Sequence, residues 1–345
     1  MDILLNVLRG GLDGLIEYLS AHVVTCLVPA LFIAGAIAAF VSQAAILKYF
    51  GPKANKGLSY SVASVSGAVL AVCSCTVLPL FGGIYKRGAG LGPAVAFLFS
   101  GPAINILAIV YSARLLGYDI GVARAIGAIT FAVVIGLAMA FIYRREQNTA
   151  DAAAFDALAD QPAGKSLWQQ VLFIGVLVAI LVFAASKNWI GAGVSFAALG
   201  LVLWRWFSRA EIVTWLKETL HFTRLIIPWL LGGVFVAGML RVIIPESWVG
   251  AAVGGNSILA NFTASVFGAL MYFATLTEVP IIKAFMDLGM GKGPALALLL
   301  AGPALSLPSM LVIRQIMGTK KMLTYVGLVV VMATVTGLAF GLISQ

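Results

Sequence analysis

Long apolar runs separated by short polar connections make up most of this chain. A helix needs about 20 consecutive apolar residues to cross a hydrocarbon layer about 30 Å thick. Ten runs approach or exceed that length, at about 22–47, 58–84, 94–116, 122–143, 167–186, 189–207, 225–244, 257–285, 295–317 and 322–343. The pattern predicts an all-α polytopic membrane protein with about ten transmembrane helices in a lipid bilayer.

Two stretches, 1–20 and 209–224, instead alternate polar and apolar positions with the period of an amphipathic helix. We expect the first to lie in the membrane interface ahead of the first span. Residues 144–166 are polar and alanine-rich, which is typical of a solvated linker. The chain therefore divides into an amphipathic helix with a first transmembrane unit (1–143), the linker (144–166), two additional spans (167–208), and an amphipathic segment with a second unit (209–345).

The composition supports the membrane assignment, because 61% of the residues are hydrophobic and only 10% are charged. Soluble domains carry roughly 25% charged residues. The net charge of +9 comes from basic residues in short loops, as the positive-inside rule describes, and predicts no nucleic-acid partner. Ten spans put both chain ends on one side, and twelve basic residues against nine favour the cytoplasm for that side.

Few residues could support catalysis or a cofactor. Two histidines and three cysteines form no triad and no Cys-x-x-Cys pair, so we expect a permease, not an enzyme, with no cofactor. The Gly-x-Gly-x-Gly-Pro turns follow no predicted strand and precede no Lys-Ser/Thr, which argues against nucleotide binding. Whether the chain forms a homo-oligomer stays open.

An internal repeat is the most informative feature of the sequence. Equivalent glycines and prolines recur at one offset (280 − 79 = 201 and 302 − 101 = 201), which predicts two homologous four-helix halves. The pairs are Gly88–Pro93 with Gly289–Pro294, Gly101–Ala103 with Gly302–Ala304, and Pro79 with Pro280.

The number of crossings between equivalent points decides the symmetry of the halves. Four spans in a unit plus the two additional spans give an even number, so both halves point the same way. If 167–207 crosses only once, the halves are inverted instead. We favour the parallel arrangement and expect the binding site where interrupted helices of the two halves meet at the centre.

The first interruption is predicted at Cys73–Pro79, which places two thiols and two hydroxyls in an apolar run. Cys73 and Cys75 would point about 200° apart on a regular helix, so both can face one ligand only if the backbone unwinds. Pro79 favours such a break. Small residues at a helix-packing seam are the alternative interpretation. A soft, thiol-seeking solute is the ligand that this stretch suggests.

Glu278 occupies the symmetry position of Val77 in the second half. A carboxylate inside a span usually faces the protein interior and has a role, and burial favours a side chain that takes up and releases a proton. The alternative is a structural ion pair with Lys283, Arg241 or Arg314. The substrate-binding residues predicted from the two halves are Cys73, Ser74, Cys75, Thr76, Pro79, Asn105, Thr275, Thr277, Glu278 and Ser306.

Three motifs carry a resemblance to a known family: Cys73–Leu80, Tyr85–Ala94 and Ser100–Asn105. With them the chain resembles the bacterial predicted permeases that include the ArsP-type trivalent organoarsenical efflux permeases. The resemblance implies a multi-pass exporter of the bacterial inner membrane that does not hydrolyse ATP. A monosubstituted trivalent arsenical has two exchangeable positions on arsenic, which two thiols could occupy.

We therefore expect a secondary transporter that exports a soft small-molecule solute, such as a trivalent organoarsenical, with Glu278 as its proton-coupling residue. Efflux of thiophilic metal ions such as copper or zinc, with Cys73, Cys75 and Glu278 as ligands, is the first alternative. A non-transporting membrane scaffold is the second.

Overall fold

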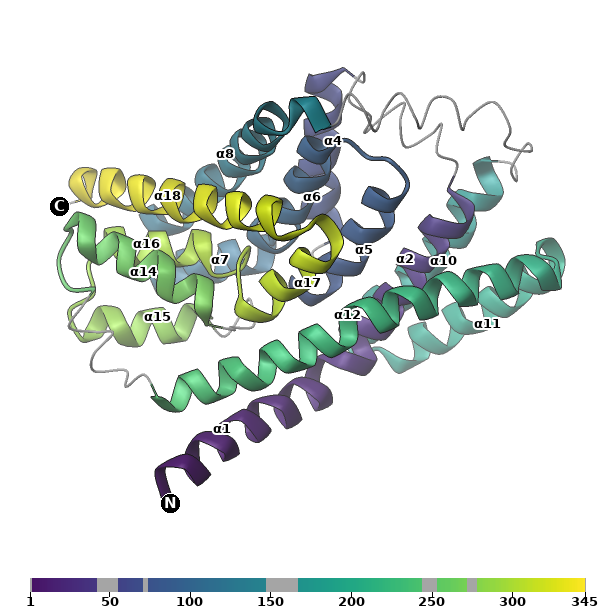
Figure 1. Ribbon diagram of the computed structural model, residues 1–345, viewed down its shortest axis with the longest axis horizontal. Helices are drawn as coiled ribbons and strands as arrows, with labels where there is room; N and C mark the ends of the chain where they lie inside the picture. Colours follow the sequence, from purple (N-terminus) through teal and green to yellow (C-terminus); the bar gives the residue numbers. More distant parts are fainter. Residues whose placement is uncertain are drawn as a thin grey trace.

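The protein is described from a computed structural model, which covers residues 2–41, 55–70, 74–146, 167–243, 253–271 and 278–344. Within these ranges the secondary structure is helical, apart from isolated bridges that join Met290 to Gly254 and Gly255. The described helices are α1 (Asp2–Tyr18), η1 (Leu19–Leu27), α2 (Val28–Phe40), α4 (Lys56–Leu70), α5 (Ser74–Lys86), α6 (Leu91–Ala103), α7 (Ile106–Leu115), α8 (Tyr118–Ile142), α10 (Leu167–Ala185), α11 (Trp189–Trp206), α12 (Arg209–Ile243), α14 (Ile258–Leu270), α15 (Glu278–Asp287), α16 (Lys292–Ala301), α17 (Leu307–Met317) and α18 (Thr319–Ile343) (Figure 1).

Among the described residues, five helices are long and apolar enough to cross a membrane. They are α8, α10, α11, α12 and α18, and α6 with α7 makes a sixth if that pair, bent by 45°, counts as one span. The all-α membrane architecture expected from the sequence is confirmed at this level, whereas the predicted count of about ten is not.

Two long helical segments lie side by side and run in opposite directions. The segments α1, η1 and α2 follow one another without a break in helical backbone angles. Gly10 of α1 lies against Gly238 near the end of α12, and Gly35 of α2 lies against Thr219 nearer its start. The amphipathic helix α1 therefore exists as expected, but it packs along α12, where glycines on both helices allow close approach.

The α14–α15 segment is a helical hairpin. The chain on either side of it meets at one end, because Gly291 N–H donates to the carbonyl of Val253 and Met290 bridges to Gly254 and Gly255. Both outer ends of the hairpin therefore lie at the same level of the molecule. The sequence-based prediction that 257–285 forms one span is wrong, since the apolar run turns back on itself.

The α4–α5 segment has the same form. Tyr60, near the start of α4, contacts Gly92, which follows closely on the end of α5. Further along, the Ser100 hydroxyl of α6 donates to the carbonyl of Ala63 at 3.1 Å, so α4 and α6 run in the same direction. Because a tight turn joins α5 to α6, α4 and α5 are antiparallel, and the predicted single span at 58–84 is also a hairpin.

Pro79 does not end a helix. It lies inside α5, which continues to Lys86, and its side chain is buried. Residues 71–73, between α4 and α5, lie outside the described residues, so the predicted break is not seen within Ser74–Lys86. Pro79 is the sixth residue of α5, past the first turn, so the helix accommodates a proline in its interior.

Helices α8 and α18 cross in opposite directions at the centre of the fold. The end of α8 lies at the start of α18, where the hydroxyls of Tyr143 and Thr324 are 2.8 Å apart and Lys321 pairs with Glu146 at 3.0 Å. Figure 1 shows α18 running from this point towards the opposite end of the molecule. The two helices have the same length and their bounds differ by 201 residues (319 − 118 = 201).

Candidate functional site: a buried ion pair

A fully buried ion pair joins two helices that are far apart in the sequence. Arg124 Nη2 of α8 donates to Glu278 Oε1 at the start of α15 over 2.5 Å, and both side chains have no exposed surface. Arg124 Nη1 also donates to the Ser112 hydroxyl of α7 at 2.8 Å. The Ser112 hydroxyl donates in turn to the carbonyl of Ala108, which fixes its orientation. Three helices thus converge on one charged cluster.

The local fold explains why these groups meet. Gly117, at a φ of 122°, connects α7 to α8, so that Ser112 and Arg124 face each other across a tight helical corner. Gly121 allows this approach, because a Cβ there would overlap Ala113. Glu278 is the first residue of α15, and α15 packs on α7. The start of α15 therefore places a carboxylate against an arginine that is 154 residues away in the chain.

Burial makes this pair expensive to break. Removing one partner of a buried ion pair costs about 3–5 kcal/mol, because the remaining charge loses its counterion without regaining water. Arg124 is the largest fully buried side chain among the described residues. The pair is therefore a strong constraint on how α8 and α15 sit relative to each other.

One donor and one acceptor of the pair remain unused. Arg124 Nε and Glu278 Oε2 are buried and have no hydrogen-bond partner among the described residues. A Cβ on Gly302 would come within 3.5 Å of Glu278 Oε2, so that glycine leaves free space beside the carboxylate. Buried polar atoms are usually satisfied by protein or water, and this site can take a water molecule or a polar group of a ligand.

The ion-pair partner of Glu278 differs from the three residues considered from the sequence. Lys283 pairs with Asp287 at 2.5 Å, and Arg314 Nε donates to the Thr319 hydroxyl at 3.1 Å. The side chain of Arg241 lies outside the described residues.

Sequence reasoning missed Arg124 because it assigned that residue to the polar edge of a span beginning near 122. Helix α8 begins at Tyr118 and thus carries the guanidinium almost two turns inside. The sequence did contain a signal for the earlier helix start, because Asp119 is an acidic residue of the kind that is favoured in the first turn of a helix.

The thiol stretch is only partly described. Cys73 and the side chains of Ser74 and Cys75 lie outside the described residues, as do Thr275 and Thr277. Thr76 is described and buried, with 1% of its surface exposed. The predicted approach of the thiols to Glu278 therefore stays a prediction.

Asn105 and Ser306 serve as equivalent helix caps. The Asn105 side-chain oxygen accepts from the backbone N–H groups of Leu107 (3.0 Å) and Ala108 (3.4 Å) at the start of α7. The Ser306 hydroxyl caps α17 through the N–H of Ser309 (3.3 Å). Asn105 therefore has a structural role as a helix cap, and its predicted contact with a substrate stays a prediction.

The described part of the chain gathers no three His, Cys, Asp or Glu side chains that could hold a metal ion. The Arg124–Glu278–Ser112 cluster is the site that the described residues offer, with two charged groups and a hydroxyl that are all buried.

Comparison with known proteins supplies the family. A family model described as a predicted permease matches residues 10–342. UPF0718 protein MJ0584 of Methanocaldococcus jannaschii is 46% identical over 360 residues, which cover 99% of this chain and 98% of that protein. UPF0718 protein YraQ of Escherichia coli is 24% identical over 266 residues, which cover 77% of this chain and 63% of that protein. No solved structure matches. The resemblance noted from the sequence is confirmed, and the chain belongs to the predicted permease family of membrane proteins.

Proposed function

We propose that this protein is a secondary transporter of the inner membrane that moves a solute by rocking two inverted halves against each other. The observation that carries the proposal is the buried Arg124–Glu278 ion pair, which joins the halves at the inner end of a helical hairpin. Transporters built from repeats commonly place their site at the repeat interface near mid-membrane, on discontinuous helices. A charge pair across that interface can form in one state and separate in another.

The helix bounds support the two halves. Helices α4, α5, α6, α7 and α8 have counterparts in α14, α15, α16, α17 and α18, in the same order. The caps Asn105 and Ser306 match, and so do Gly117 and Gly318, which both have positive φ. Packing is reciprocal as well, since α5 packs on α17 and α15 packs on α7.

The directions of equivalent helices favour inversion over the parallel symmetry expected from the sequence. Helices α8 and α18 are antiparallel, and so are α2 and α12. If each hairpin enters and leaves on one side, a half crosses the membrane three times. The crossings are made by α2 or α12, by the pair α6–α7 or α16–α17, and by α8 or α18. With α10 and α11 added, five crossings lie between the start of α2 and the start of α12, and an odd number inverts the second half. The full chain then crosses eight times.

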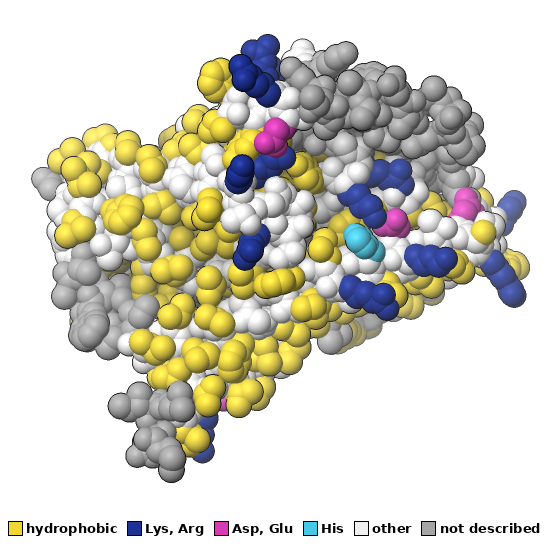
Figure 2. All heavy atoms as spheres, viewed as in Figure 1, with side chains coloured by type: hydrophobic (Ala, Val, Ile, Leu, Met, Phe, Trp, Pro, Cys, Tyr) yellow, Lys and Arg dark blue, Asp and Glu magenta, His cyan; other side chains and the backbone are white. Residues whose placement is uncertain are grey.

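Eight crossings also change the predicted orientation. The side that holds the ends of α5, α8 and α11 and the starts of α12 and α18 carries twelve described basic residues, against six on the other side. Figure 2 shows Lys and Arg gathered over that end of the molecule and apolar side chains over the rest. By the positive-inside rule this side is cytoplasmic. Both chain ends then lie outside the cytoplasm, opposite to the placement favoured by the sequence.

The solute follows from the thiol stretch. Helix α5 begins at Ser74, so Cys73 and Cys75 flank the inner end of the first hairpin in sequence. Thiolates favour soft species, and two of them match a trivalent arsenical with two exchangeable positions. We therefore propose export of a soft, thiol-reactive solute such as a trivalent organoarsenical, with thiophilic metal ions as the alternative.

Proton coupling is proposed at Glu278. A proton on the carboxylate would cancel its attraction to Arg124 and allow α15 to leave α8, and loss of the proton would restore the pair. One charge moving through 100 mV supplies about 2.3 kcal/mol. That energy corresponds to a solute gradient on the order of fiftyfold, since 1.4 kcal/mol is tenfold.

Transport into everted vesicles tests the proposal. A host lacking arsenical exporters would express the full chain, and respiring everted vesicles would be offered methylarsenite, antimonite or copper and zinc salts in separate assays. We expect accumulation of methylarsenite that collapses with a protonophore and is lost in Cys73→Ala/Cys75→Ala. Accumulation of a metal salt alone would select the alternative, and no accumulation of any solute would favour the scaffold. A Cys26→Ala variant controls for thiol loss in general.

A further inference from the structure

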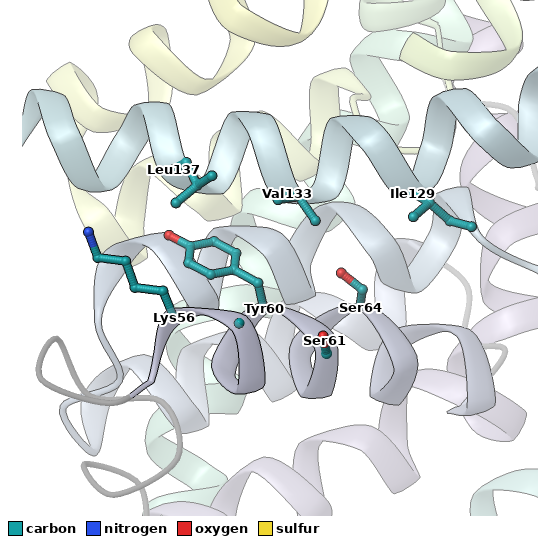
Figure 3. Close-up of a pocket in the computed structure, with 8 residues that line it drawn as sticks. Lys56, Tyr60, Ser61, Ser64, Ile129, Val133 and Leu137 are labelled. Atoms are coloured by element: carbon teal, nitrogen blue, oxygen red, sulfur yellow. The ribbon is translucent and has the colours of Figure 1, made fainter.

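A groove lies between α4 and α8 in the first half. Its volume is about 400 Å³, and it is lined by Lys56, Gly57, Tyr60, Ser61, Ser64, Ile129, Val133 and Leu137. Figure 3 shows the α8 side chains forming one wall and the α4 side chains the other, with Lys56 at one end and Ser64 towards the opposite end. Ile129 and Leu137 are 51% and 40% exposed, so the groove opens to the outside of the helix bundle.

The two walls differ in chemistry. The α8 wall is apolar, whereas the α4 wall presents an ammonium, a phenol and a hydroxyl at positions 56, 60 and 64, which share one helix face. The Ser64 hydroxyl is more than nine-tenths buried, points towards α8 in Figure 3 and has no hydrogen-bond partner among the described residues. A serine in a membrane helix usually satisfies itself or a neighbour, so an unused buried hydroxyl in a groove marks room for an acceptor.

In the second half, the corresponding contact between α14 and α18 is closed by a hydrogen bond. Ser265 stands 201 residues after Ser64 (265 − 64 = 201), and it accepts from the Thr334 hydroxyl of α18 at 3.2 Å. Val133 of α8 stands where α18 has Thr334 (334 − 133 = 201), so the equivalent bond cannot form in the first half. The position of Lys56 is held by Ser257, which caps α14 through the N–H of Ala260 (3.0 Å).

We propose that the α4–α8 groove binds one anionic phospholipid. Lys56 would face the phosphate, Tyr60 and Ser64 would donate to oxygens of the glycerol esters, and an acyl chain would lie along Ile129 and Val133. Eight residues of α4 separate Lys56 from Ser64, which is about 12 Å along the helix and suits the depth of a phospholipid headgroup region. The donors on α4 require an acceptor-rich ligand, and a phosphodiester with ester carbonyls supplies acceptors and a negative charge.

The charge of the surrounding surface favours an anionic lipid over a neutral one. Lys56 lies on the basic side of the molecule, with Lys86 and Arg87 at the end of the neighbouring hairpin helix α5. Lys86 is engaged by Glu218 at 2.5 Å, whereas Lys56 is exposed and has no ion pair among the described residues. A lysine near a membrane surface attracts anionic lipid headgroups.

Native mass spectrometry of the purified full chain tests this proposal without any transport assay. Delipidated protein in detergent would be titrated with dioleoyl phosphatidylglycerol and, separately, with dioleoyl phosphatidylcholine. We expect one phosphatidylglycerol adduct that survives collisional activation better than the phosphatidylcholine adduct. Lys56→Gln should weaken it about fivefold, and Lys217→Gln, an exposed lysine of α12 on the same side, should leave it unchanged.

A second pair of variants separates groove binding from general charge attraction. Val133→Trp would fill the groove, and Thr334→Trp would serve as the matched control in the second half, with circular dichroism to verify folding of both. If either protein unfolds, Val133→Phe and Ser64→Ala replace that pair. Loss of the adduct in the groove variants supports the site. Equal phosphatidylglycerol binding in wild type and all groove variants, or equal retention of both lipids, overturns it.

Discussion

The buried ion pair makes its sharpest prediction through a double-mutant cycle. Arg124→Met removes the guanidinium and leaves the Glu278 carboxylate without a counterion, while Glu278→Gln leaves the arginine charge unpaired. Both groups have no exposed surface and lie 2.5 Å apart, so each single change should cost about 3–5 kcal/mol of stability. The double variant has no buried charge left and should be more stable than either single variant.

The measurement is the free energy of unfolding of purified protein in a mild detergent, by denaturant titration or thermal scanning at one heating rate. The exposed pair of Lys292 with Asp119 supplies the control, because its 2.8 Å contact is 44% and 42% exposed. Lys292→Met should cost less than about 1 kcal/mol. If the two single changes simply add in the Arg124→Met/Glu278→Gln variant, the charges are independent and the reasoning fails.

Transport by the same variants separates structure from coupling. The double variant should fold and bind solute yet fail to accumulate it when a proton gradient is applied, because the Glu278 carboxyl group proposed to carry the proton is gone. Proton-driven accumulation equal to wild type by Glu278→Gln alone would reduce the pair to a structural contact. The charge pair would then fix the position of α15 without sensing a proton.

The remaining predictions concern packing and orientation. Gly35→Leu should destabilise the fold by about 1–3 kcal/mol or abolish expression, since a Cβ there would overlap the Thr219 hydroxyl and backbone, whereas Gly232→Leu, with open space around it, should be tolerated. Thr334→Val should cost about 1 kcal/mol by removing the bond to Ser265, as read from unfolding of the purified protein. A reporter fused after Gln345 that is active only in the periplasm should be active, and an inactive one would return the chain ends to the cytoplasm.

Much of the membrane architecture could be predicted from local patterns, because hydrophobic length and helix caps depend on neighbouring residues alone. The 201-residue offset predicted the equivalent positions of Pro79 and Pro280, and the helix bounds follow it. What failed was the assumption that an apolar run of sufficient length crosses. The runs at 58–84 and 257–285 are as apolar as true spans, yet each folds into a hairpin whose reversal depends on tertiary packing.

Only one of the two residues of the ion pair was identified from the sequence. Glu278 stood out because a carboxylate in an apolar run is costly, and that cost is a property of the residue and its surroundings in sequence. Its partner Arg124 did not stand out, because it lies 154 residues away in the chain and near the end of a span, where arginine side chains normally reach water. The packing of α15 on α7 brings the two together, and that tertiary contact leaves no pattern in the local sequence.

The same geometry ties orientation to mechanism. If α4–α5 and α14–α15 are hairpins that enter from opposite sides, their inner ends carry Cys73 and Glu278 to the centre from opposite faces of the membrane. A solute would then be held by thiols on one hairpin and a proton by the other hairpin. The two would compete through the conformation of the shared interface, without binding to the same atom. Exchange requires only that the solute-bound and protonated states disfavour each other by a few kcal/mol, which is within the cost of separating the Arg124–Glu278 pair. The direction of such an exchange would be set by the solute and proton gradients, and the Arg124–Glu278 pair would couple the two.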